Sequence, residues 1–132
     1  MILFLLDTNI VSELSRPRPN AGFARWMASA DQQAISVITV EELRYGLSKV
    51  PNQRIEQFME HYLSTTPVFD VTADIARRAG VMRGSFTRKG ITRDQSDMLI
   101  AATAQAHNLT LVTRNTRDFE GCGIGLLNPF TD

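Results

Sequence analysis

Short apolar runs alternate along the chain with longer stretches in which apolar residues recur every three or four positions. The short runs predict buried strands, and the longer stretches predict helices with one face in the core. Because strands that alternate with helices pair in parallel, we expect an α/β fold, a three-layer α/β/α sandwich around a mainly parallel sheet of four to five strands. We expect one domain over residues 1–132. The predicted strands are 2–6, 34–38, 68–71, 109–113 and 124–127. Three helices are predicted over about 8–14, 21–30 and about 39–49. Three more are predicted, of which two begin at residues 53 and 73 and the last ends near residue 107.

Polar residues at the expected helix ends support these boundaries. Asn52 and Thr72 stand directly before two helical stretches and are suited to be N-caps, and Asn108 is suited to be a C-cap. The segments 39–42 and 92–95 both have the form of a capping box, with Thr first and Glu or Gln fourth.

Composition places the chain among ordinary globular proteins, with 43% apolar and 21% charged residues in 132. Cys122 is the single cysteine, so no intrachain disulfide can form, and a reducing cytoplasm fits. The first apolar run is too short for a signal peptide or a membrane span, so we expect no membrane partner.

Four carboxylates lie shortly after the end of a predicted strand or at the start of a predicted helix: Asp7, Glu42, Asp97 and Asp118. In open α/β sheets ligands bind beyond the carboxyl ends of the strands. Acids gathered there without cations would repel one another, and a hard divalent cation is the simplest way to hold them together.

Three of these acids have a competing structural role. Asp7 is placed to cap the following helix, and Glu42 is the fourth residue of a capping box. Asp118 has Arg114 and Arg117 close by in sequence, so a surface ion pair is the alternative there. These alternatives stay open at the level of sequence.

Asp97 has the weakest structural alternative. On a helix it shares one line with Ile100, Ala101 and Ala104, which have the composition of a buried face. A carboxylate on that line is partly desolvated and needs a cation, a metal or several donors. Asp94 is either a substitute ligand or an acid of the first helical turn.

Basic residues are concentrated in one segment although the net charge is zero. Residues 77–93 contain six basic residues and no acid, which leaves 8 basic and 14 acidic residues in the rest of the chain. This arrangement suits a nuclease, with cations on phosphates and acids on metal, but a solvated helix face is an equal alternative. Our candidates for contacts with the phosphates of a nucleic acid are Arg83, Arg88, Lys89, Arg93 and Arg114.

Other chemistries fit the sequence poorly. His61 and His107 lack metal-ligand spacing, and Cys122 lacks an evident base partner. No glycine-rich phosphate loop follows a predicted strand, and Asp7 lacks the second acid two residues on that a phosphatase with an aspartate nucleophile would carry.

Five segments, taken in order, resemble one family. They are Leu6-Asp7-Thr8-Asn9, the stretch 38–46 around Glu42, the stretch 97–104 opened by Asp97, the stretch 111–119 ending at Asp118-Phe119, and the closing Asn128-Pro129-Phe130. Together they resemble the PIN-domain ribonucleases, and within them the VapC-type toxins of prokaryotic toxin–antitoxin pairs, including the FitB-like branch.

The resemblance implies a PIN-like fold and a metal-dependent endoribonuclease that hydrolyses RNA to a 5′-phosphate and a 3′-hydroxyl. Asp7, Glu42 and Asp97 match the three acids that ligate Mg²⁺ or Mn²⁺, and the fourth position falls on Asn115 or Asp118. We expect Asp7 and Asp97 to be direct ligands, with Glu42 and Asp118 acting through water or on a second metal. The resemblance also implies a homodimer silenced by a cognate antitoxin, often a DNA-binding one. Supporting polar residues are Thr8, Asn9, Thr113 and Asn115.

Two other classes of function compete with this interpretation. A receiver-like signalling domain also places acids and Mg²⁺ at strand ends, but it requires an adjacent acidic pair after the first strand and a lysine after the last, and the chain has only Lys49 and Lys89. A non-catalytic PIN module acting through its antitoxin complex would keep the acids, and a nuclease assay with and without metal separates it from an enzyme.

Overall fold

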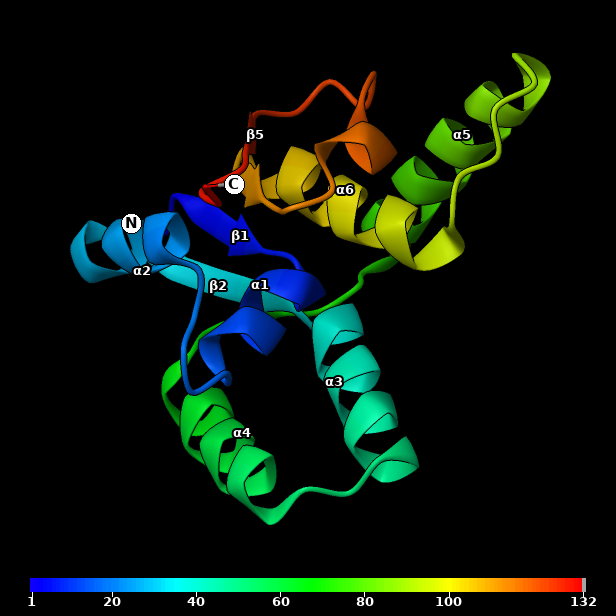
Figure 1. Ribbon diagram of the computed structural model, residues 1–132. Helices are drawn as coiled ribbons and strands as arrows, with labels where there is room; N and C mark the ends of the chain where they lie inside the picture. Colours follow the sequence, from blue (N-terminus) through cyan, green and yellow to red (C-terminus); the bar gives the residue numbers. More distant parts are fainter. Residues whose placement is uncertain (132) are drawn as a thin grey trace.

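Five parallel strands form the centre of the computed structural model, which describes residues 1–131 (Figure 1). Their order across the sheet is β3-β2-β1-β4-β5, and every neighbouring pair is parallel. The predicted sheet is therefore confirmed. The strands are β1 (Phe4–Leu6), β2 (Gln33–Ser36), β3 (Val68–Phe69), β4 (Thr110–Val112) and β5 (Leu126–Leu127).

Six α-helices cover the two faces of the sheet, as the three-layer prediction requires. Leu5 and Leu111 point into a core shared with α5 and α6. Leu6 and Val112, the next residues along the same strands, point into a second core shared with α1 to α4. The helices are α1 (Thr8–Leu14), α2 (Ala21–Ser29), α3 (Val37–Lys49), α4 (Gln53–Thr65), α5 (Ala73–Arg88) and α6 (Gln95–His107), and a 3₁₀ helix, η1 (Thr116–Phe119), follows β4. None of the helices in residues 1–131 is both long and apolar enough to cross a membrane.

Helix α6 lies against the sheet along most of its length. Ile100, Ala101 and Ala104, the residues expected to share a line with Asp97, are all fully buried. The small alanines let α6 approach the sheet closely, and α5 packs against its other side. The predicted buried face of this helix is confirmed.

Local capping signals predicted some helix ends well. The side chain of Asn52 accepts from the Ile55 amide at 3.1 Å, and that of Thr72 accepts from the Ile75 amide at 3.2 Å. Asn108 adopts the left-handed conformation, with φ of 54°, at the C-cap of α6. These three predictions are confirmed.

Both predicted capping boxes are wrong. Helix α3 begins at Val37 because Ser36, the last residue of β2, caps it and accepts from the Ile38 amide at 3.0 Å. Helix α6 is capped by Asp94, which accepts from the Ser96 amide at 3.0 Å. The predicted strand 34–38 therefore ends at Ser36, where its pairing with β3 also ends. The other strands likewise end within the predicted ranges, and η1 was not predicted.

The strand order creates a crevice at the carboxyl end of β1. The chain builds β2 and β3 on one side of β1 and then returns to place β4 and β5 on the other side. The connections that leave β1 and β4 therefore run in opposite directions across the sheet. Open α/β sheets bind ligands at the carboxyl ends of two neighbouring strands whose connections diverge in this way. Asp7 follows β1 directly, and Thr113 follows β4 directly.

Candidate functional site

Asp7 is buried at this crevice and serves two roles at once. It is the N-cap of α1, where its Oδ1 accepts from the Thr8 amide at 2.8 Å. Its Oδ2 accepts from the Thr113 hydroxyl at 2.8 Å and from the Asn9 side-chain amide at 3.2 Å. Neutral donors thus orient the carboxylate without neutralising it. Capping and a place in the site are compatible here.

Thr113 links the loops that follow β1 and β4. While its hydroxyl donates to Asp7, its oxygen accepts from the Asn115 amide at 3.0 Å and from the Asn9 side chain at 3.4 Å. The side-chain oxygen of Asn9, Oδ1, in turn accepts from the Arg114 backbone amide at 3.2 Å. Asn9 and Thr113 therefore hold the two strand ends in register around Asp7.

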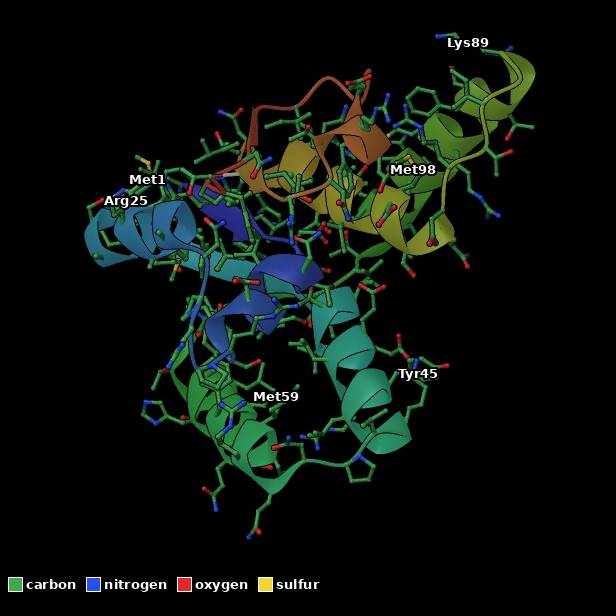
Figure 2. The ribbon with its side chains drawn as sticks, viewed as in Figure 1. Met1, Arg25, Tyr45, Met59, Lys89 and Met98 are labelled. Carbon is green, nitrogen blue, oxygen red and sulfur yellow. The ribbon has the colours of Figure 1, made fainter. Side chains whose placement is uncertain are left out.

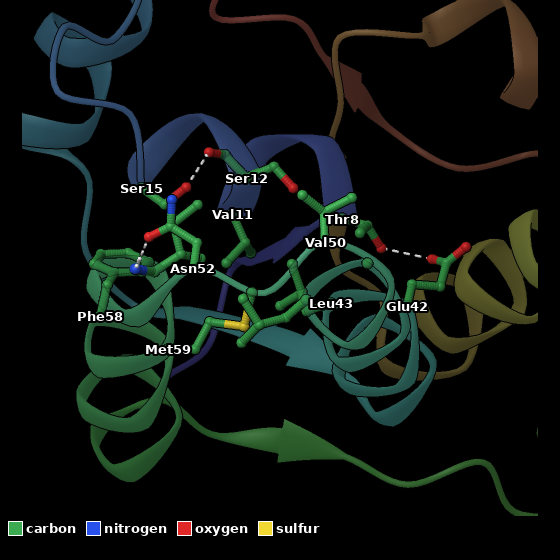
Figure 3. Close-up of a pocket in the computed structure, with 13 residues that line it drawn as sticks. Thr8, Val11, Ser12, Ser15, Glu42, Leu43, Val50, Asn52, Phe58 and Met59 are labelled. Atoms are coloured by element: carbon green, nitrogen blue, oxygen red, sulfur yellow. Dashed lines mark hydrogen bonds between the residues drawn. The ribbon is translucent and has the colours of Figure 1, made fainter.

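Glu42 lies in the second turn of α3 and faces α1. Its Oε1 accepts from the Thr8 hydroxyl at 2.6 Å (Figure 3). The Thr39 hydroxyl, fully buried, lies 3.2 Å from the Thr8 hydroxyl. Because Ser36 caps α3, Glu42 has no capping role. Sequence reasoning gave Thr39 the wrong role, although its i, i+3 spacing to Glu42 could have placed it beside the site.

Asp97 lies half-buried in the first turn of α6 and has the most perturbed carboxyl group. Burial, reinforced by the negative charges of Asp7, Asp94 and Asp118, raises its pKa to about 7. Among the ion pairs found in residues 1–131, none includes Asp97. Its charge is therefore left without a protein cation.

Asp118 lies on η1, exposed to solvent, and its charge reaches the crevice. It contributes to raising the pKa of both Asp7 and Asp97. The alternative ion pair with Arg114 or Arg117 is absent among residues 1–131. Between the two candidates for a fourth site residue, Asp118 is the one that brings a charge close to the other acids.

The four acids form a set whose charges are not balanced within the protein. Burial raises the pKa of Asp7 and of Glu42, and hydrogen bonds from Thr113 and Thr8 respectively oppose the shift. In residues 1–131 no three His, Cys, Asp or Glu side chains are gathered closely enough to hold a metal by themselves. This donor set fits Mg²⁺, which commonly uses one or two carboxylates and keeps several waters.

A model of the PIN domain matches residues 4–122. The chain belongs to the PIN-domain family. It is 32% identical to the toxin FitB of Neisseria gonorrhoeae over 98% of this chain and all of that one, and 34% identical to the ribonuclease VapC2 of Haemophilus influenzae over 91% and 92%. It resembles the crystal structure of FitAcB from N. gonorrhoeae with a TM-score of 0.84 at 30% identity, covering 96% of this chain and 98% of that one. A toxin–antitoxin complex from Klebsiella pneumoniae gives a TM-score of 0.76 at 35% identity, covering 97% and 98%.

The basic segment of this PIN domain divides into two groups. Arg77 and Arg78 both pair with Asp74 at 2.8 Å, so their charge is partly balanced. The exposed cations lie further along α5, and Lys89 marks the projecting end of that helix in Figure 2. Arg83 and Arg88 belong to this exposed group.

The two remaining RNA-contact candidates have internal contacts. The Arg114 guanidinium lies 4.7 Å from the centre of the Phe130 ring, near the C-terminal tail. Arg93 donates to backbone carbonyl groups on and after η1. The Lys89 ammonium lies 6.0 Å from the centre of the Phe86 ring, at the limit of such a contact, so Arg83, Arg88 and Lys89 are the most available of the five candidates to a ligand.

An apolar groove adjoins the acidic site between α1, α3 and α4 (Figure 3). Its volume is about 290 Å³, and Val11, Leu43 and Met59 contribute to its lining. Thr8 and Glu42 also line the groove, so one of the four acids belongs to it. A ligand that fills the groove would therefore reach the edge of the acidic site.

Proposed function

We propose that this PIN domain is a metal-dependent endoribonuclease that acts as the toxin of a toxin–antitoxin pair. The observation that carries the proposal is the set of four acids, Asp7, Glu42, Asp97 and Asp118, around the carboxyl ends of the central strands, for which residues 1–131 provide no ion-pair partner. The names of the relatives agree, since one is a toxin and another a ribonuclease.

Asp7 and Asp97 would hold the metal directly, because both are desolvated and carry charge that the protein leaves unbalanced. Glu42 and Asp118 would act through water or on a second metal. A bound Mg²⁺, or Mn²⁺ in its place, would lower the pKa of a water and stabilise the charge that develops on the scissile phosphate. Thr8, Asn9 and Thr113 orient the carboxylates, and Asn115 supports Thr113 through its amide.

The substrate would be RNA, and its backbone would be held by the exposed cations Arg83, Arg88 and Lys89. These residues flank the chain that leads from α5 into α6, and Asp97 lies in the first turn of α6. A strand bound along the end of α5 would therefore be directed toward the acids.

The protein partner would be a cognate antitoxin, as in the toxin–antitoxin complex from K. pneumoniae that the fold resembles. The apolar groove between α1, α3 and α4 is a suitable seat for it, because a segment in that groove reaches Glu42. We also propose that the toxin acts as a homodimer in the cytoplasm.

A cleavage assay with purified protein tests the enzymatic part of the proposal. Labelled single-stranded RNA should be cut internally with Mg²⁺ or Mn²⁺, and chelation with EDTA should stop the reaction. DNA of the same sequence and the Asp97→Asn variant, purified in parallel, are the controls. Equal cleavage by Asp97→Asn, or no cleavage by the wild type with either metal, would overturn the proposal.

The toxin role needs a cellular test. Expression of the wild type should arrest growth, whereas Asp97→Asn should not. Co-expression of the adjacent small reading frame should restore growth and yield a stable complex. Growth that is unaffected by an active wild-type nuclease would contradict the toxin role while leaving the enzyme intact.

A further inference from the structure

Among the basic residues of segment 77–93, Arg93 is the one whose guanidinium donates to backbone carbonyl groups. Its Nη1 donates to the carbonyl oxygen of Asp118 at 2.6 Å, and its Nη2 donates to the carbonyl oxygen of Glu120 at 2.8 Å. The centre of the guanidinium lies 4.1 Å from the centre of the Phe86 ring. One side chain thus joins the end of α5, the segment before α6, and η1.

We propose that Arg93 is a positioning residue for the active site, which fixes η1 so that Asp118 stays close to Asp7 and Asp97. This inference rests on the proposed function, because it assigns Asp118 to the site. It replaces the RNA-contact role that the basic segment suggested for Arg93.

Electrostatics make such a tether necessary. Asp118 carries the same negative charge as Asp7 and Asp97, the two acids with which it would share the site, so the three carboxylates repel one another. It is exposed on a 3₁₀ turn of four residues, which repulsion can displace outward. Phe119, only 1% exposed, anchors the turn from the core side, and Arg93 holds it from the α5 side.

The chemistry of arginine suits this role. A guanidinium is a planar fork that can reach two acceptors at once, and its face stacks on an aromatic ring. The last carbonyl groups of a short helix lack partners within the helix, so they are free to accept from a side chain. A lysine ammonium is a compact point charge without a planar fork, so it cannot reproduce both the paired donation and the stacking on Phe86.

The same contacts argue against a phosphate-binding role. Two guanidinium nitrogens of Arg93 already donate to backbone oxygens, and Phe86 covers one face of the group. To contact a phosphate, Arg93 would have to release η1. Its removal should therefore impair turnover and the response to metal, while RNA binding is retained.

Substitution of Arg93, with Arg77→Ala as the matched control, tests the inference, because Arg77 lies on α5 but is not among the residues proposed to contact RNA. Arg93→Ala should lower kcat by about tenfold to a hundredfold, because displacement of a site group by about 1 Å can have that effect. The Mg²⁺ concentration for half-maximal activity should rise several-fold. The Kd for RNA, measured in the inactive Asp97→Asn background, should stay within about twofold, and Arg93→Lys should recover part of kcat. An unchanged kcat, or a weakened Kd with kcat intact, would overturn the inference.

Amide hydrogen exchange gives a readout that does not depend on activity. Exchange over residues 116–120 should accelerate in Arg93→Ala and not in Arg77→Ala. Phe86→Leu removes the ring face but keeps an apolar side chain, so it should produce a smaller acceleration and also serves if Arg93→Ala fails to fold. Unchanged exchange in a folded variant would overturn the tether. A wild type that shows no metal-dependent cleavage would defeat the proposed function, and the exchange result would still decide the role of Arg93.

Discussion

The acids of the site are oriented by neutral donors. Asp7 accepts from Thr8, Asn9 and Thr113, and Glu42 accepts from the Thr8 hydroxyl. Hydrogen bonds to a carboxylate are stronger than those between neutral groups, yet they leave its charge in place. An arginine or lysine in the same position would orient the acid and also neutralise it. The choice of Thr and Asn therefore keeps the negative charge available to a cation.

Removing one charge should separate catalysis from folding. We expect Asp7→Asn and Asp97→Asn each to abolish RNA cleavage at matched Mg²⁺. Asp97→Asn should raise the melting temperature of the metal-free protein, because it removes a charge from a repelling set. Asp7→Asn should not raise it, because both oxygens of Asp7 accept hydrogen bonds and an amide can accept with only one. Retained cleavage by either folded variant would contradict the site assignment.

The raised pKa of Asp97 predicts the pH dependence of stability. Its pKa in the folded protein is about 7, above the ordinary value of 3.8. Between these values the folded state binds more protons than the unfolded state, so stability falls as pH rises. The melting temperature of the metal-free protein should therefore fall between pH 5 and pH 8. In the Asp97→Asn variant the melting temperature should depend less on pH. A wild-type curve that rises over this range, or the same slope in both proteins, would contradict the prediction.

Glu42 provides a test that the sequence alone left ambiguous. Because Ser36 caps α3, Glu42→Gln should leave the melting temperature almost unchanged. Gln can still accept from Thr8, so only the charge is lost. Cleavage should nevertheless fall by orders of magnitude. Near-wild-type kcat in Glu42→Gln would remove this residue from the site.

Site residues could be predicted from the sequence where the signal for them lies close by along the chain, and not where their partners are distant in sequence. Asp7 and Asp97 were predictable because each stands directly beside an apolar run that the sequence displays. Arg93 was not, because its acceptors lie 25 and 27 residues away and are backbone carbonyl groups that carry no sequence signal. Thr39 lies 31 residues from its neighbour Thr8, and its only local signal was its i, i+3 spacing to Glu42.

At the scale of elements, helix ends show how local patterns compete. The segments 39–42 and 92–95 both satisfy the capping-box pattern, yet Ser36 and Asp94 are the residues that cap α3 and α6. A cap requires extended backbone at one residue, and the end of strand pairing fixes that residue at Ser36. Pairing between strands is a tertiary property, so local sequence predicted helix α3 but not its starting point. Where the capping residue followed no such constraint, as at Asn52, the prediction held.

Asp94 can be tested as a cap against the alternative that it is a metal ligand. Asp94→Asn keeps a side-chain acceptor for the Ser96 amide, so stability and cleavage should both be close to wild type. Asp94→Ala should destabilise the protein by about 1 kcal/mol, the usual value for loss of an N-cap. Chemical denaturation and cleavage rates measure the two effects. Loss of cleavage in a stable Asp94→Asn protein would instead make Asp94 a ligand.

At the scale of the whole molecule, the strand order assembles the site. Asp7 and Thr113 are far apart in sequence, yet the Thr113 hydroxyl lies 2.8 Å from Asp7 Oδ2. They meet because β1 pairs with β4, the two strands whose connections run to opposite sides of the sheet. The alternation of strands and helices predicted parallel pairing, and therefore acids at one edge. It could not predict the order β3-β2-β1-β4-β5, which decides which strand ends become neighbours.

The distribution of charge over the molecule predicts how RNA is held. The exposed cations of α5 lie apart from the acids, so they should contribute to binding and not to chemistry. Each phosphate contact with a single strand contributes about −0.7 to the slope of log K against log[salt]. Replacing Arg83, Arg88 and Lys89 together with Gln should therefore weaken RNA binding and flatten this slope by up to about 2. Turnover of bound RNA should change little.

Arg77 and Arg78 supply the matched control for that experiment, because both already pair with Asp74. When Arg77 and Arg78 are replaced with Gln, the change in salt slope per substituted residue should be smaller than in the triple variant. Binding is measured across a salt series in the inactive Asp97→Asn background, so that the RNA stays intact. If the triple variant keeps the wild-type slope, the exposed end of α5 is only a solvated face. The RNA must then follow another basic surface, either near Arg114 and Arg117, on the loop and the 3₁₀ helix that follow β4, or near Arg16 and Arg18.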